Sequence, residues 1–178
     1  MLENKIVDHQ VLFDNPMAQI VVDTLEYGGS RRKYFYLSSP VNAVATVGLT
    51  AESQLILTRQ YRHPIGQVIY DLPAGRLNPG EDPLVGARRE FEEETGYFPE
   101  HIEQLGYYNQ FPGMLRAATT LFFARNLKPT RQNLDEGEVL ELIHLPVETV
   151  LRMITQGEII DGSLQLGVLL AWRKGLLG

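Results

Sequence analysis

Residues 75–97 read GRLNPGEDPLVGARREFEEETGY, and no other stretch of the chain constrains its structure as strongly. Asp82 is a favoured helix N-cap, and Pro83 suits the first helical position, where its missing N–H is not needed. Gly96 lies where a helix commonly ends in a left-handed residue. Together, these start and stop signals predict a helix over residues 83–95 between two loops.

Three carboxylates of this helix share one face. Glu90, Glu93 and Glu94 are three and four residues apart, so we expect their side chains to converge. Converging carboxylates raise one another's pKa unless a cation lies among them, and hard oxygen ligands suit Mg²⁺ or Mn²⁺. Arg89 can pair with a neighbouring carboxylate and fix its orientation. The alternative is a solvated acidic face held by local ion pairs.

The apolar residues of the same helix indicate which side is buried. Leu84, Ala87 and Phe91 recur at helical spacing, so we expect all three to face a core. Glu81 adds an acidic group at the junction between the loop and the helix.

The whole stretch resembles the Nudix box. The pattern is Gly, five residues, Glu, seven residues, then Arg-Glu-apolar-any-Glu-Glu-any-Gly-apolar, and its specified positions are filled by Gly75, Glu81, Arg89, Glu90, Phe91, Glu93, Glu94, Gly96 and Tyr97. The resemblance implies an α/β fold, a Nudix-type α/β/α sandwich with a mixed sheet. It also implies hydrolysis of a nucleoside diphosphate linked to another group.

The resemblance assigns roles within the box. It implies metal ligation by Glu90, Glu94, the Ala74 carbonyl and Glu93, a catalytic part for Arg89 and for Glu93, and a structural part for Gly75, Glu81 and Gly96. The implied cofactor is Mg²⁺, with Mn²⁺ as the other option.

Composition excludes several classes of function. The chain has 178 residues, of which 44% are hydrophobic, and this suits one main domain. A net charge of -6 argues against nonspecific nucleic-acid binding, and the lack of cysteine excludes disulfides and thiol nucleophiles. The stretch MLENKIVDHQ has no signal-peptide pattern and no apolar run reaches about 18 residues, so we expect no membrane partner and a cytoplasmic location.

Turn signals divide the chain. Residues 7–37 read as short strands separated by Asn15–Pro16 and Gly28–Gly29. We therefore predict a small N-terminal antiparallel β segment over residues 1–39 and a hydrolase domain over residues 40–178. Beyond the acidic helix, further helices are expected over residues 146–155 and 162–176.

Three motifs outside the box resemble the ADP-ribose pyrophosphatase branch of the Nudix family. They are RQYRHP at residues 59–64, LPAG at residues 72–75 and PGM at residues 112–114. The implied reaction is hydrolysis of ADP-ribose to AMP and ribose 5-phosphate. The implied substrate-binding residues are Arg62 and Arg59 for the diphosphate, and Pro112, Gly113 and Met114 for the wall around the terminal ribose.

The resemblance implies that a loop glutamate, Glu138, activates the attacking water. Asp135, Glu136 and Glu93 remain alternatives for this general base. In this branch the N-terminal segment commonly joins two subunits, so a homodimer is implied. Tyr34 and Phe35 are then candidates for stacking on adenine across the dimer, or for simple packing in a sheet.

The box does not specify the groups attached to the diphosphate, so other functions remain as alternatives. It binds only the shared diphosphate, so another nucleotide sugar such as GDP-mannose, or a dinucleotide, remains an alternative substrate. A rival of another class is a non-catalytic module that senses a nucleotide sugar. Such modules usually lose box carboxylates, whereas this chain keeps all of them.

Overall fold

The computed structural model describes residues 5–178. They form two compact units. The first comprises the described residues up to Asn42 together with Asn109–Ala118, and the second comprises Ala43–Tyr108 and Thr119–Gly178. Within the described residues, no helix is both long and apolar enough to cross a membrane.

The first unit is a small sheet with the order β1-β2-β3-β9. Strands β1 (Lys5–Asp14), β2 (Gln19–Tyr27) and β3 (Ser30–Ser38) are antiparallel neighbours, and the short β9 (Leu115–Arg116) runs parallel to β3. Between β2 and β3, Gly28 and Gly29 have φ angles of 58° and 79°, which only glycine adopts without strain. The predicted antiparallel β segment is confirmed.

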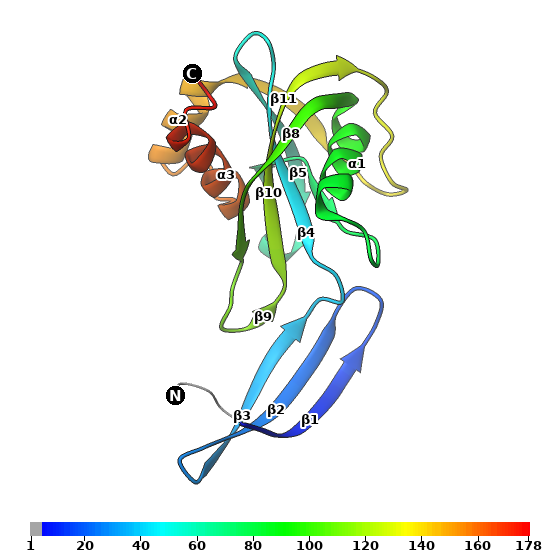
Figure 1. Cartoon of the computed structure of the whole chain (residues 1–178), viewed down its shortest axis with the longest axis vertical. Helices are drawn as coiled ribbons and strands as arrows, with labels where there is room; N and C mark the ends of the chain where they lie inside the picture. Colours follow the sequence, from blue (N-terminus) through cyan, green and yellow to red (C-terminus); the bar gives the residue numbers. More distant parts are fainter. Residues whose placement is uncertain (1–4) are drawn as a thin grey trace. The chain divides into compact units, whose positions relative to one another are not determined.

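The second unit contains a mixed seven-stranded sheet (Figure 1). Its main path is β11-β5-β4-β10-β8, with β6 paired to β5 and β7 paired to β4. The strands are β4 (Ala43–Leu49), β5 (Gln54–Arg62), β6 (Gln67–Asp71), β7 (Ala74–Arg76), β8 (Tyr97–Asn109), β10 (Ala118–Pro129) and β11 (Glu141–Pro146). A short 3₁₀ turn, η1 (His63–Ile65), links β5 to β6.

Helices cover both faces of this sheet. In Figure 1, α1 (Pro83–Thr95) lies on one face, and α2 (Val147–Thr155) and α3 (Gly162–Arg173) lie on the other. Alternation along β5 explains how both faces become apolar: Leu55 and Leu57 join the core under α2 and α3, whereas Ile56 packs with Phe91 of α1. The predicted α/β/α sandwich with a mixed sheet is therefore confirmed.

The bounds of α1 agree with the sequence signals. The Asp82 side chain accepts hydrogen bonds from the Leu84 and Val85 amides, and Gly96 ends the helix with φ 69°. Ala87 and Phe91 are fully buried, but the prediction for Leu84 is wrong, because its side chain lies in the exposed first turn.

The other two helices differ slightly from expectation. Helix α2 begins one residue later than predicted, with Pro146 as its N-cap. Helix α3 begins at Gly162 as predicted but ends at Arg173, three residues before the expected end. The reason is local: Gly175 adopts φ 71°, which stops the helix.

Candidate active site

Strand β7 and helix α1 approach each other closely at Gly75. This residue lies in β7, which pairs with β4. A Cβ atom at Gly75 would lie 2.1 Å from the carboxyl carbon of Glu90. The glycine therefore lets the backbone pass directly beside the Glu90 carboxylate.

Arg89 ties the box carboxylates together. Its Nε and Nη2 donate to the two carboxylate oxygens of Glu81, both at 2.9 Å. Its Nη1 donates to Glu90 at 2.8 Å and to Glu93 at 3.0 Å. The hydrogen bonds from Arg89 lower the pKa of Glu81 to about 2. Arg89 thus fixes the orientation of three carboxylates, as the sequence had suggested for at least one.

Glu94 is the most buried acid of the helix. Its side chain is almost fully enclosed, and its Oε2 accepts a hydrogen bond of 3.0 Å from the Ala74 amide. Burial raises the pKa of Glu94 to about 9, and the charges of Glu138 and Glu90 add to the effect. Burial also raises the pKa of Glu90, although Arg89 opposes the shift. A positive ligand would offset these costs.

The loop that carries Glu138 is anchored to the end of α1. The Gln132 side chain donates to the Glu94 carbonyl at 2.7 Å, and the Asn133 amide donates to the Glu93 carbonyl at 2.8 Å. These bonds bring the loop back to the box, and the Glu138 charge acts on both Glu90 and Glu94. Residues far apart in sequence thus form one acidic group.

This donor set fits a hard divalent cation. It consists of carboxylates held against the backbone of β7 at Ala74 and Gly75, and such oxygens are the ligands that Mg²⁺ prefers. Within residues 5–178 no group of three or more His, Cys, Asp or Glu side chains is placed so that it could hold a metal ion. Mg²⁺ rarely uses an all-protein cage and is typically bound by one or two carboxylates together with substrate oxygens and waters.

Both predicted diphosphate-binding arginines have carboxylate partners. Arg62, at the end of β5, donates from Nε to Asp71 at 3.1 Å and also from Nη2. Arg59 makes a longer cross-strand ion pair with Glu141, at 3.5 Å. Their binding to a diphosphate stays a prediction. Sequence reasoning missed Asp71, although its place directly before LPAG was a usable signal.

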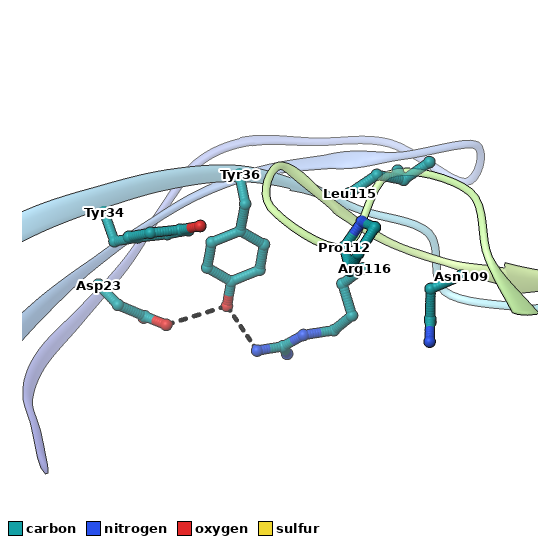
Figure 2. Close-up of a pocket in the computed structure, with 7 residues that line it drawn as sticks. All are labelled: Asp23, Tyr34, Tyr36, Asn109, Pro112, Leu115 and Arg116. Atoms are coloured by element: carbon teal, nitrogen blue, oxygen red, sulfur yellow. Dashed lines mark hydrogen bonds between the residues drawn. The ribbon is translucent and has the colours of Figure 1, made fainter. Parts of the chain in front are cut away.

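The first unit contains a cavity of about 360 Å³ (Figure 2). Its lining residues are Asp23, Tyr34, Tyr36, Asn109, Pro112, Leu115 and Arg116. As Figure 2 shows, the Tyr36 hydroxyl donates to Asp23 at 3.1 Å and accepts from Arg116 at 2.7 Å. The Arg116 guanidinium also lies over the Tyr36 ring, 4.7 Å from its centroid. The cavity therefore combines aromatic faces with both signs of charge.

The structure brings several predicted residues together at this cavity. Tyr34 and Pro112 line it, the Tyr34 hydroxyl donates to the Gly113 carbonyl, and the Met114 carbonyl accepts from the Leu37 amide at 2.8 Å. Phe35 does not line it, because alternation along β3 directs its side chain to the opposite face. The partners missed by sequence reasoning are Asp23, Tyr36 and Arg116.

Fold and box together define a class of enzyme. Residues 39–164 match the NUDIX domain model, and the chain belongs to the Nudix family. It is 32% identical over 170 residues to the methanol dehydrogenase activator of Bacillus methanolicus, covering 94% of this chain and 92% of that protein. It is 28% identical over 164 residues to the ADP-ribose pyrophosphatase of Bacillus subtilis (strain 168), covering 91% and 89%.

A solved structure supports the same fold. The crystal structure of an ADP compounds hydrolase superposes with a TM-score of 0.88 at 22% identity, covering 98% of this chain and 96% of that one. Within the Nudix family, the predicted resemblance to the ADP-ribose pyrophosphatase branch is confirmed, and the protein is a Nudix pyrophosphatase. Nudix hydrolases of this kind generally depend on divalent metal.

Proposed function

We propose that this Nudix pyrophosphatase hydrolyses the diphosphate bond of ADP-ribose to AMP and ribose 5-phosphate with Mg²⁺ as cofactor. The observation that carries the proposal is the hydrogen-bonded group of box carboxylates, Glu90, Glu93 and Glu94. The loop that carries Glu138 is anchored to this group through Gln132 and Asn133. Metal-assisted hydrolysis of a diphosphate uses a general base close to the residues that hold the metal. The similarity to ADP-ribose pyrophosphatases supports the choice of substrate.

In this proposal Glu90, Glu94 and the Ala74 carbonyl hold Mg²⁺, with Glu93 as a further ligand and Mn²⁺ as an alternative ion. Bound metal would offset the diphosphate charge and increase the acidity of water. Arg89 keeps Glu90 and Glu93 oriented through its 2.8 and 3.0 Å hydrogen bonds. The Ala74 amide does the same for Glu94.

Glu138 is the proposed general base, which accepts the proton of the attacking water. Its half-buried side chain lies on a loop anchored to α1, whereas Asp135 and Glu136 are exposed. Glu93 is a weaker alternative, because its carboxylate is already paired with Arg89. The leaving phosphate oxygen departs on the side opposite the attacking water.

Binding groups for the rest of the substrate are also proposed. Arg62 binds a diphosphate oxygen with its planar fork, and Arg59 assists with its charge. Tyr34 stacks on adenine across the proposed dimer, and its position on the wall of the cavity supports this role. Pro112, Gly113 and Met114 shape the surface around the terminal ribose.

A substrate panel tests the proposal. ADP-ribose, GDP-mannose, other nucleotide sugars and dinucleotides are incubated with the protein and Mg²⁺, and products are identified by chromatography. We expect AMP and ribose 5-phosphate from ADP-ribose, with the highest kcat/KM of the panel, and no turnover after chelation of the metal. Equal or faster cleavage of any other compound would contradict the substrate assignment.

A second candidate role comes from the 32% identity to a methanol dehydrogenase activator. In this role the protein would raise the activity of a dehydrogenase. The test measures the initial rate of a methanol dehydrogenase alone, with the wild-type protein, and with the Glu94→Gln variant. Stimulation that is lost in the variant supports this role and ties it to hydrolysis, and no stimulation rejects it.

The remaining parts of the proposal concern the subunit assembly, the domain division and the cellular location. We propose a homodimer in which the segment over residues 1–39 makes the subunit contact, with residues 40–178 as the hydrolase domain. A cytoplasmic location is proposed from the sequence alone.

A further inference from the structure

The carbonyl groups of the last turn of α1 are bound by the loop that follows β10. A helix leaves the carbonyls at its C-terminal end without partners of its own. The Asn133 amide donates to the Glu93 carbonyl at 2.8 Å, and the Gln132 side-chain amide donates to the Glu94 carbonyl at 2.7 Å. The loop therefore binds the backbone of the same turn that carries two proposed metal ligands.

The glycine that ends α1 makes room for this loop. Gly96 adopts φ 69°, and a Cβ atom there would lie 2.9 Å from the backbone nitrogen of Gln132. The Thr130 amide adds a further bond, to the Gly96 carbonyl at 2.7 Å. Gly96 thus serves both the end of the helix and the close approach of the loop.

A tight turn farther along the loop carries Glu138. The Glu138 amide donates to the Asp135 carbonyl at 3.0 Å, and the Glu138 carboxylate accepts from the Asp135 amide at the longer distance of 3.4 Å. Two residues separate Gln132 from the start of this turn. A displacement of Gln132 therefore reaches the Glu138 turn through a very short stretch of chain.

We propose that Gln132 is a positioning residue that holds the Glu138 loop against the end of α1, in the geometry that proton transfer needs. This inference rests on the proposed function, in which Glu138 accepts the proton of the attacking water. A general base must lie within hydrogen-bond reach of that water, so a small displacement of its loop slows the step. Loss of the Gln132 bond should therefore lower kcat and leave KM unchanged.

Gln132→Met removes the donor and keeps the length of the side chain, because methionine cannot donate a hydrogen bond. Gln132 is exposed, so water can replace it at the Glu94 carbonyl and the fold should persist. Gln132→Ala removes the same donor with a smaller side chain and serves as a second variant. The matched control is Gln165→Met on α3, because the Gln165 side chain makes an equal bond of 2.7 Å to the Ile159 carbonyl.

The experiment measures kcat and KM for ADP-ribose, together with the Mg²⁺ concentration that gives half the maximal rate. We expect Gln132→Met to lower kcat about five- to tenfold, the effect of one hydrogen bond. Its KM and Mg²⁺ requirement should stay within about twofold of wild type. Gln165→Met should leave all three values unchanged. A higher Mg²⁺ requirement in Gln132→Met would mean that Gln132 acts on the metal ligand Glu94, and would overturn the inference.

A double variant shows whether Gln132 acts through Glu138. In the Glu138→Gln protein the base is already lost, so the addition of Gln132→Met should change kcat by less than about twofold. If the two losses multiply instead, Gln132 acts independently of Glu138 and the inference is wrong.

The single variants separate the two levels of the proposal. If Glu138→Gln loses turnover while Gln132→Met and Gln132→Ala keep the wild-type kcat, Gln132 only binds the end of α1 and the inference fails alone. If Glu138→Gln keeps the wild-type kcat, the assignment of Glu138 as the base fails and the inference falls with it.

Discussion

Close neighbours in the folded structure explain why two positions of the box are glycine. Gly86 sits inside α1, where glycine weakens a helix by about 1 kcal/mol relative to alanine. A Cβ there would lie 2.3 Å from the Leu77 side chain and 3.1 Å from a Glu81 oxygen. The lost helix stability is therefore offset by close packing of the loop on the helix. Gly75 is required for a similar reason, because a Cβ atom there would overlap the Glu90 carboxylate.

Glu94→Gln changes the charge of one buried side chain and keeps its shape. The amide oxygen can still accept from Ala74, so we expect the fold to persist. Turnover should fall by about two or more orders of magnitude if Glu94 holds the metal. The measurements are kcat with Mg²⁺ and thermal unfolding. Glu92→Gln, on the same helix, is the control, and unchanged activity in Glu94→Gln would remove Glu94 from the site.

Glu138→Gln tests the identity of the base. We expect kcat to fall about 100- to 1,000-fold with little change in KM, because a base acts in the transition state and not in binding. The control is Glu136→Gln on the same turn, whose side chain is exposed. A larger loss in Glu136→Gln than in Glu138→Gln would reassign the base.

At the level of elements, features that depend on neighbouring residues could be predicted from the sequence, whereas features that depend on contacts between distant residues could not. Asp82, Pro83 and Gly96 defined both ends of α1, because capping depends on neighbouring backbone groups. The box glutamates follow from helical spacing alone. The hydrogen bond from Arg116 to Tyr36 could not be read in this way, since it depends on how β9 pairs with β3.

The loop before α1 is held to the helix by Glu81, and this contact should depend on pH. The folded pKa of Glu81, about 2, lies below its ordinary value of 4.5, so its contribution is present above pH 4.5 and is lost as the pH falls toward 2. Glu81→Gln should destabilise the protein by about 1–3 kcal/mol at pH 7, because Arg89 loses a charged partner. Urea unfolding at pH 7 and pH 3 measures this difference, which should shrink at pH 3. A constant difference would show that ionisation of Glu81 does not matter.

At the level of the whole molecule, the β1–β3 sheet leaves one apolar face uncovered. The register places Phe13, Ile20 and Leu37 in one row across the three strands, and their exposed fractions are 52%, 39% and 48%. Exposed Phe35 lies on the same face. Adjacent apolar side chains of this size are uncommon on a monomer surface and mark interaction sites.

The proposed homodimer would bury this face, and a second copy of the chain offers the same apolar row for self-complementary packing. Leu37→Asp places a charge in the middle of the row, and an unpaired charge is costly to bury. Light scattering coupled to size exclusion should therefore show a dimer for the wild type at micromolar concentration and a monomer for Leu37→Asp. Leu169→Asp, at an exposed position of α3 in the second unit, should remain dimeric. A monomeric wild type, or a variant that stays dimeric, would mean that this face does not form the subunit contact.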